Sequence, residues 1–275
     1  MLVFTDLDGT LLDQNYSWEP AAKVIENLKT AGVPLIFCSS KTRAEIEHYR
    51  EAMGIKDPFI SENGACTFIP DGYFDFEFPF TKESGGYKLI EAGKPYGEVL
   101  DKINEIKGVP GMGGITCFSD MTDEQLSTDA RLPLKLARLA KEREYTEVFK
   151  YSGDANLLKK EAESRGLSVV FGGRYWNAGC GGDKGAATKT LIQLFSKKNG
   201  PVRSMGIGDS TSDLPMLMAV NTPVLMMRRD GTHEKADIAG LQRTHLWGPE
   251  GWSRKVLSML VKELVTNSRR DEEVL

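Results

Sequence analysis

The first sixty residues alternate between short apolar runs and longer mixed stretches. Uninterrupted apolar runs are typical of strands that are buried on both faces, and they occur at 2–5, 33–38 and 59–60. Helices are predicted between them. Ser17 can cap a helix over about 18–31 that ends at Gly32. Thr42 and Glu45 have capping-box spacing and begin a helix that reaches about Gly54. Strands that alternate with helices in this way predict a doubly wound parallel sheet of the α/β class.

The pattern changes after residue 83. Ser84-Gly85-Gly86 is typical of a linker, and the segment from there to about 173 predicts a smaller α+β unit. Helices are expected over 96–107, from Thr122 (with Gln125 in capping-box spacing) and over 154–165, and strands over 113–119, 147–151 and 167–171.

The first pattern then returns. A helix is predicted over 183–196, a strand over 202–208, a helix capped by Ser212, a strand over 223–227 and an amphipathic helix over 251–265. The last residues, 266–275, are polar and predict a frayed tail. We therefore expect a core of 1–83 and 174–275, interrupted by an inserted cap domain over 84–173.

Composition narrows the function classes. The chain has 275 residues and a net charge of −4, from 35 Lys and Arg against 39 Asp and Glu, which argues against non-specific nucleic-acid binding. No apolar run approaches the roughly 20 residues of a membrane helix, and no signal-peptide pattern opens the chain. The four cysteines are scattered without a CxxC pair, which predicts reduced thiols in a cytoplasmic protein. Oligomeric state is not indicated.

Polar residues follow three of the predicted strands. Asp6 follows the first, Ser39 the second and Asp209 a later one. The carboxyl ends of parallel strands meet at one edge of a sheet, where ligands bind. Asp6, Asp8, Asp209 and Asp213 would then share one crevice, which is unfavourable without a cation. Carboxylates with no His or Cys nearby favour Mg²⁺.

Groups that favour an anion accompany these carboxylates. Lys184 lies at a predicted helix start in the sequence GGDKG, where its ammonium and exposed amides could hold a phosphate. Ser39 offers a hydroxyl group and Ser40 a further donor. Carboxylates, a hard metal and phosphate donors together indicate phosphoryl transfer, in which a carboxylate can be the nucleophile. The alternative for each Asp is a turn or helix-cap role, and for Lys184 a solvated position.

The order and spacing of these residues resemble the four motifs of the haloacid dehalogenase superfamily of phosphatases. The match comprises DLDGT at 6–10, Ser39, Lys184 and GDSTSD at 208–213. The resemblance implies that Asp6 is the nucleophile, that Asp8 is the general acid and base, and that Ser39 and Lys184 bind the phosphoryl group. It also implies Mg²⁺ held by the Asp6 carboxylate, the Asp8 carbonyl and Asp209, with Asp213 as a ligand or just outside the ligand set. One branch of the superfamily carries a mobile α/β cap after the third strand.

Further stretches are similar to the branch that acts on phosphorylated sugar-glycerates, mannosyl-3-phosphoglycerate in particular. They are SSKTR at 39–43, SENGA at 61–65, REYTE at 143–147, GRYW at 173–176 and GPEGW at 248–252. Such a substrate needs a fork donor for its carboxylate, which Arg174 could supply, and polar partners for its sugar. The predicted substrate-binding residues are Ser40, Lys41, Glu62, Asn63, Glu144, Tyr145 and Arg174.

Three alternatives stay open. The substrate could be another sugar phosphate, such as glucosyl-3-phosphoglycerate or a phosphohexose. A phospho-accepting signalling module also uses a strand-end Asp with Mg²⁺, but it needs neither Asp8 as an acid nor a large cap. A phosphomutase would return the phosphate to a sugar instead of to water.

Overall fold

The computed structural model describes the backbone of residues 1–273 and the side chains of residues 1–262. The chain forms two compact units, Met1–Ile36 with Phe195–Leu275, and Phe37–Leu194. The second unit includes the whole of the predicted cap, 84–173, together with flanking segments of the predicted core. The cap boundaries themselves stay a prediction. In the part of the chain that the structure describes, every helix is too short or too polar to cross a membrane.

A five-stranded sheet is built mainly from the first unit, in the order β13-β12-β11-β1-β2. The neighbouring pairs β1 with β11, β11 with β12 and β12 with β13 are parallel, which confirms the predicted parallel sheet. Every residue of β1 and β11 is buried, as expected of strands that are covered on both faces of a parallel sheet. The strands are β1 (Leu2–Thr5), β2 (Leu35–Phe37), β11 (Ser204–Gly208), β12 (Thr222–Leu225) and β13 (Gln242–Arg243).

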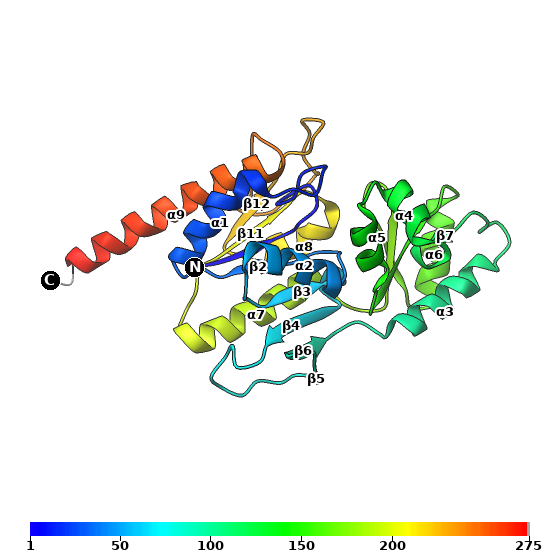
Figure 1. Ribbon diagram of the computed structural model, residues 1–275, viewed down its shortest axis with the longest axis horizontal. Helices are drawn as coiled ribbons and strands as arrows, with labels where there is room; N and C mark the ends of the chain where they lie inside the picture. The colour runs from blue at the N-terminus through cyan, green and yellow to red at the C-terminus, as the bar shows by residue number, and fades with distance from the viewer. Residues whose placement is uncertain (274–275) are drawn as a thin grey trace. The chain divides into compact units, whose positions relative to one another are not determined.

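The helices of this unit are close to those predicted. They are η1 (Glu19–Ala21), α1 (Ala22–Thr30), η4 (Thr211–Asp213), α8 (Leu214–Ala219) and α9 (Gly248–Glu273). Helices α1 and α9 pack side by side, and α8 packs on β11 and β12 (Figure 1). The predicted tail, 266–275, overlaps the end of α9 and residues 274–275, which lie outside the described residues.

The prediction that Ser212 caps a helix is wrong. Ser210 and Asp213 form the capping box, around the 3-10 turn η4, and Asp213 then precedes α8. Pro215 explains the shift, because proline is favoured in the first turn of a helix, where its missing N–H is not needed.

The second unit contains an antiparallel sheet in the order β3-β4-β6-β5. Strand β3, predicted in the parallel sheet, pairs with β4 instead and has an isolated parallel bridge between Cys38 and Ile60. The predicted linker at Ser84-Gly85-Gly86 is wrong, because Gly85 and Gly86 form the two-residue turn of the β5–β6 hairpin. Both have positive φ, 60° and 81°, as a type I′ turn needs. The strands are β3 (Phe59–Ser61), β4 (Cys66–Pro70), β5 (Lys82–Ser84) and β6 (Tyr87–Glu91).

A further antiparallel sheet in this unit has the order β7-β8-β10-β9. Helices α3 and α6 pack on it and on each other (Figure 1), and Ile103, Phe149 and Leu158 are fully buried in the core between them. The strands are β7 (Thr116–Cys117), β8 (Thr146–Lys150), β9 (Ser168–Phe171) and β10 (Trp176–Gly179). The helices of the unit are α2 (Arg43–Met53), η2 (Glu62–Gly64), α3 (Tyr96–Lys107), η3 (Phe118–Asp120), α4 (Asp123–Ala130), α5 (Leu134–Lys141) and α6 (Ala155–Ser164). Helix α7 (Lys184–Asn199) belongs to this unit as far as Leu194.

Capping predictions are confirmed at two helices. Thr42 with Glu45 and Thr122 with Gln125 each form both hydrogen bonds of a capping box, and α2 ends at Gly54 with φ 65°. Five strands, β4, β5, β6, β10 and β13, and the helix α5 were not predicted. All four cysteines are free and buried, as expected of structural thiols.

Candidate active site

Asp6 is fixed at the carboxyl end of β1. Its amide donates to the carbonyl of Ile207 at 2.9 Å, so the ladder between β1 and β11 continues to the site. Its carbonyl accepts a bond from Thr5 Oγ1 at 2.7 Å, and Trp252 Nε1 donates to that same hydroxyl oxygen at 3.0 Å. Trp252 is fully buried. A terminal helix thus anchors the backbone on which the Asp6 carboxylate is carried.

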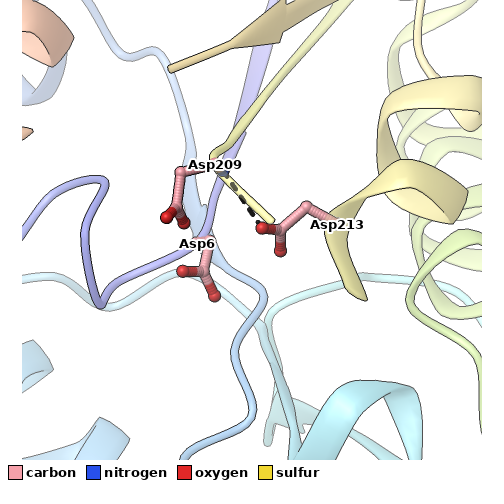
Figure 2. A group of neighbouring side chains, drawn as sticks. All are labelled: Asp6, Asp209 and Asp213. Atoms are coloured by element: carbon pink, nitrogen blue, oxygen red, sulfur yellow. Dashed lines mark hydrogen bonds between the residues drawn. The ribbon is translucent and has the colours of Figure 1, made fainter. Parts of the chain in front are cut away.

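Asp6, Asp209 and Asp213 form one group of carboxylates (Figure 2). Each offers one oxygen, and the three oxygens lie within 4.8 Å of one another. The structure therefore brings together three of the four predicted carboxylates. Asp8 is exposed, does not belong to this group, and has its backbone in an isolated bridge with Leu12. Three hard anionic oxygens at this spacing repel one another and match the ligands of a divalent cation such as Mg²⁺.

The Asp213 carboxylate is held by the loop that precedes it. Its Oδ2 accepts bonds from the amides of Asp209 at 3.1 Å and Ser210 at 3.0 Å, and from Ser210 Oγ at 2.8 Å. Gly208 makes this possible, because a Cβ at that position would lie 2.4 Å from Asp213 Cβ. Ser210 was not predicted as a functional residue, although its capping-box spacing to Asp213 could have identified it.

The turn after β1 also packs against Asp209. Gly9 has φ 73°, and a Cβ on it would lie 2.8 Å from Asp209 Oδ2. Thr10 Oγ1 donates to Asp209 Oδ1 at 3.3 Å. The DLDGT sequence therefore supplies both Asp6 and the close backbone approach that sets the position of Asp209.

Ser39 and Lys184, the predicted phosphate-binding residues, both lie in the second unit and are buried. Ser39 Oγ accepts a bond from the amide of Lys41 at 3.3 Å. Lys184 is the first residue of α7 and only 2% exposed. A Cβ on Gly64 would lie 2.6 Å from the amide nitrogen of Lys184. The amide of Asn63 donates to the carbonyl of Ser39 at 2.9 Å, so the turn at 62–64 contacts both segments.

The predicted substrate residues differ in their surroundings. Lys41 is buried and forms an ion pair with Glu45 at 3.1 Å, and Tyr145 donates its hydroxyl to Glu91 at 2.7 Å. Arg174 is exposed and stacks on Tyr175, with its guanidinium carbon 5.2 Å from the ring centroid. The remaining members, Ser40, Glu62, Asn63 and Glu144, lie in or against the segment 143–146 or the turn 62–64.

Arg174 lies apart from the other predicted substrate residues. Thr146 pairs with Gly179 in the register of β8 and β10, whereas Arg174 precedes Trp176 at the other end of β10. The structure therefore places this predicted carboxylate-binding residue away from Glu144 and Tyr145.

Burial is the main influence on the Glu144 carboxylate. It raises the pKa of Glu144, the nearby charge of Arg43 opposes this, and the charge of Glu62 adds to it. One Glu144 oxygen, Oε2, is buried without a hydrogen-bond partner. Burial likewise raises the pKa of the Cys66 thiol to about 12, which makes it an inert core residue.

This chain is similar to known hydrolases. Residues 3–84 match the family model described as haloacid dehalogenase-like hydrolase. The chain is 39% identical to the glucosyl-3-phosphoglycerate/mannosyl-3-phosphoglycerate phosphatase of Methanococcoides burtonii, over 95% of this chain and 97% of that protein. It is 38% identical to the mannosyl-3-phosphoglycerate phosphatase of Pyrococcus furiosus, over 86% of this chain and 94% of that protein.

A solved structure extends the comparison to the fold. The sucrose-phosphatase of Synechocystis sp., in complex with sucrose and phosphate, superposes with a TM-score of 0.61 at 12% identity, over 94% of this chain and 97% of that one. This chain thus shares the fold of that structure. The sequence relatives show that this chain belongs to the mannosyl-3-phosphoglycerate phosphatase family of haloacid dehalogenase-like hydrolases.

Proposed function

We propose that this protein is a Mg²⁺-dependent phosphatase that hydrolyses mannosyl-3-phosphoglycerate to mannosylglycerate and phosphate through an aspartyl-phosphate on Asp6. The observation that carries the proposal is the group of three carboxylates at the end of β1 and β11, with the DLDGT turn beside it. The relatives over nearly the whole chain support the substrate.

The reaction has two half-steps. A carboxylate oxygen of Asp6 forms a bond to phosphorus while the bond to the glycerate oxygen breaks, and Asp8 gives its proton to that leaving oxygen. Asp8 then takes a proton from water, the water oxygen attacks phosphorus, and the bond to Asp6 breaks. Phosphate leaves and both carboxylates return to their starting states. In this proposal Ser39 and Lys184 bind the phosphoryl oxygens throughout.

The cluster of three carboxylates is suited to Mg²⁺. Asp6, Asp209 and Asp213 supply hard oxygens within the reach of one ion, and the Asp8 carbonyl is a further ligand in the proposal. The ion supplies positive charge that offsets the carboxylates and the phosphate when bound. Its loss leaves Asp6 facing an anionic substrate beside two other negative groups.

Specificity is assigned to the cap, 84–173, and to the residues beside it. The proposed contacts with sugar and carboxylate come from Ser40, Lys41, Asn63, Glu144, Tyr145 and Arg174. A cytoplasmic location is proposed from the free, scattered cysteines. The fork shape of a guanidinium supports Arg174 as the partner of the substrate carboxylate, although the register of β8 and β10 separates Arg174 from Glu144 and Tyr145.

Glucosyl-3-phosphoglycerate is a second candidate substrate, because the Methanococcoides relative is named for both compounds. Phosphate release from the two glycosyl-phosphoglycerates, a hexose phosphate and an aryl phosphate decides between them, measured with and without Mg²⁺. We expect the highest kcat/KM for mannosyl-3-phosphoglycerate. Equal or better kcat/KM for the hexose phosphate would contradict the assignment.

The mechanism predicts distinct effects for the two carboxylates of DLDGT. Asp6→Asn removes the nucleophile and should abolish turnover and phosphoenzyme formation. Asp8→Asn should leave Mg²⁺ binding intact and lower kcat by about 10²–10⁴-fold, because both half-steps lose their proton transfer. Phosphoenzyme trapping and steady-state phosphate release measure these effects. Asp71→Asn, at an exposed turn, is the control that should keep wild-type rates. Hydrolysis at the wild-type rate by the Asp6 variant is the result that rejects the mechanism.

A further inference from the structure

Glu62 is a buried carboxylate whose acceptor sites are occupied by one short segment of chain. Its side chain is 0% exposed. Oε1 accepts a bond from the amide of Glu144 at 2.8 Å. Oε2 accepts from the amides of Tyr145 at 3.2 Å and Thr146 at 2.7 Å, and from Thr146 Oγ1 at 2.7 Å. Four donors to one carboxylate leave little capacity to bind a sugar hydroxyl.

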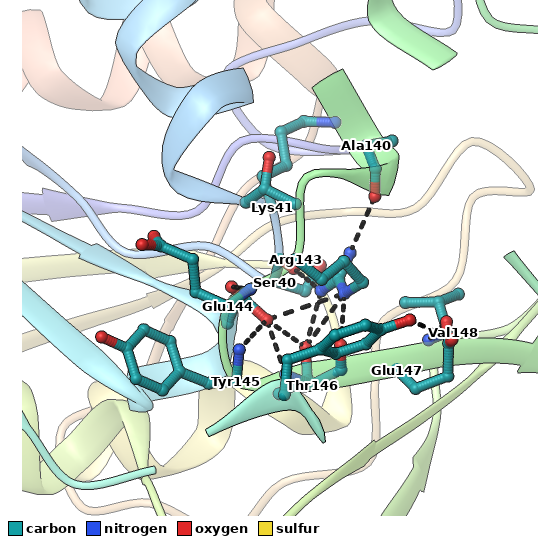
Figure 3. Close-up of polar contacts among 12 residues, drawn as sticks. Ser40, Lys41, Ala140, Arg143, Glu144, Tyr145, Thr146, Glu147 and Val148 are labelled. Atoms are coloured by element: carbon teal, nitrogen blue, oxygen red, sulfur yellow. Dashed lines mark hydrogen bonds and ion pairs between the residues drawn. The ribbon is translucent and has the colours of Figure 1, made fainter. Parts of the chain in front are cut away.

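Arg143 supplies the balancing positive charge and a second link. Its guanidinium is 3% exposed and lies 3.6 Å from Glu62 Oε2. Figure 3 shows its hydrogen bonds, among them those from Nη2 to the carbonyl of Ser40 at 2.9 Å and from Nε to the carbonyl of Thr146 at 2.8 Å. The segment 143–146 is thereby joined to the loop that carries Ser39.

The backbone of Glu62 continues this connection. Its amide donates to the carbonyl of Lys41 at 3.0 Å, and the next amide, of Asn63, donates to the carbonyl of Ser39 at 2.9 Å. Glu62 and Asn63 both have positive φ, 47° and 60°, which side-chain-bearing residues adopt at an energetic cost. A strained turn of this kind persists only where the surrounding contacts fix it, as they do here.

Gly64 joins the same turn to the start of α7. A Cβ on Gly64 would lie 2.3 Å from the carbonyl carbon of Asp183 and 2.6 Å from the amide nitrogen of Lys184. The turn 62–64 is therefore in contact with three segments: 39–41, 143–146 and 183–184. Two of these segments carry proposed phosphate-binding residues, and the third carries Glu144 and Tyr145.

We propose that Glu62 is a positioning residue, not a substrate ligand, and that it fixes the segment 143–146 relative to the loops carrying Ser39 and Lys184. A sugar-glycerate phosphate is long enough to need both sets of contacts at one spacing, whereas a small aryl phosphate needs only the phosphate-binding set. The catalytic effect rests on the proposed function, but the structural effect on residues 144–146 does not.

Glu62→Gln tests this role. The amide keeps the shape of the side chain but replaces an acceptor oxygen with an NH₂ group facing backbone N–H donors. We expect kcat/KM for mannosyl-3-phosphoglycerate to fall about thirtyfold, against less than about threefold for p-nitrophenyl phosphate. Hydrogen exchange at the amides of residues 144–146 should become at least about tenfold faster. Thr146→Val removes one of the donors to Glu62. It should lower kcat/KM for mannosyl-3-phosphoglycerate and speed exchange at residues 144–146, each by about three- to tenfold. This variant tests the proposal if Glu62→Gln does not fold.

Glu147→Gln is the matched control. This carboxylate is also fully buried, and it accepts bonds at 2.7 Å from Tyr96, Ser119 and Val148. Its loss should affect both substrates equally and leave exchange at 144–146 within about threefold of wild type. An equal fall for both substrates in Glu62→Gln, or unchanged exchange at 144–146, overturns the proposal. Failure of the mannosyl assignment alone would leave the exchange result intact, so the two failures are distinguishable.

Discussion

Gly208 shows how closely single residues determine the geometry of the candidate metal site. It ends β11, is buried, and lies where any Cβ would meet Asp213 Cβ at 2.4 Å. The carboxylate of Asp213 in turn accepts the amides of Asp209 and Ser210. A methyl group at 208 cannot be accommodated by a flexible side-chain end, because the atoms it meets are close to the backbone.

Gly208→Ala is therefore predicted to displace Asp213 and weaken Mg²⁺ binding. We expect the Mg²⁺ concentration for half-maximal activity to rise about tenfold, with a loss of about 1–3 kcal/mol in the free energy of unfolding from overpacking. Titration of activity with Mg²⁺ and denaturant unfolding measure the two effects. Gly113→Ala, at a position with no atom within 4 Å of the added Cβ, is the control and should change neither. An unchanged Mg²⁺ requirement in Gly208→Ala would mean that Asp213 does not shape the metal site.

The buried position of Glu62 cannot be inferred from the sequence, for a physical reason. Asp6, Asp209 and Asp213 were predicted to converge because each follows or adjoins a strand end, a local feature. The role of Glu62 depends on partners 82 to 84 residues away along the chain. The family resemblance of the stretch 61–65 assigned Glu62 to substrate binding, whereas hydrogen bonds from residues 144–146 occupy its carboxylate inside the protein. Such contacts between distant segments have no signature in one sequence.

At the scale of elements, prediction succeeded where a local signal marks the boundary. The starts of α2 and α4 follow from capping boxes, and β1 follows from its apolar run. Strand β10 contains Asn, Ala and Gly, which have low strand propensity, and it exists because β8 and β9 pair with it on both sides. Helix α5 begins after Pro133 without a side-chain cap, so its start has no capping signal in the sequence.

Glu144, in the segment between α5 and β8, makes the stability of the protein depend on pH. Burial raises the pKa of Glu144, and the charge of Glu62 raises it further. A raised pKa means that folding disfavours the ionised form. The free energy of unfolding therefore falls as pH rises from the ordinary value of 4.5 toward the raised pKa, and the loss persists at neutral pH. Below the ordinary value the group is protonated in both states and contributes no difference.

Glu144→Gln should consequently be more stable than wild type at pH 7.5 and equal to it at pH 4. Thermal unfolding across this range measures the difference, which we expect to be about 1 kcal/mol or less because the side chain is only half-buried and Arg43 offsets part of the cost. Glu142→Gln, at an exposed neighbouring position, should show no such pH-dependent gain. A variant whose advantage grows toward acid pH would contradict the assigned sign.

At the scale of the whole molecule, the cluster of Asp6, Asp209 and Asp213 lowers the stability of the fold while it provides the proposed metal site. Asp6, Asp209 and Asp213 bring their oxygens within 4.8 Å of one another, and mutual repulsion of their charges opposes folding when no cation is bound. The fold tolerates this because β1, β11 and the packing of Trp252 supply rigid support around the group. In the proposed function, Mg²⁺ binds the folded state alone and therefore raises the unfolding temperature by mass action.

Asp209→Asn is predicted to be more stable than wild type without Mg²⁺ and to lose the stabilisation that Mg²⁺ provides. Removing one of the three charges should raise the unfolding temperature in EDTA by about 2–4 °C, since about 1 kcal/mol of repulsion is relieved. The same variant should lose the further rise that millimolar Mg²⁺ gives the wild-type protein, and with it phosphatase activity. Differential scanning calorimetry in EDTA and in Mg²⁺ measures both effects, and Asp71→Asn, at an exposed turn, should behave as wild type in both buffers. If Asp209→Asn is destabilised in EDTA and keeps the Mg²⁺ shift, then the three carboxylates do not form the metal site, because removal of one charge would have neither relieved repulsion nor weakened binding of the ion.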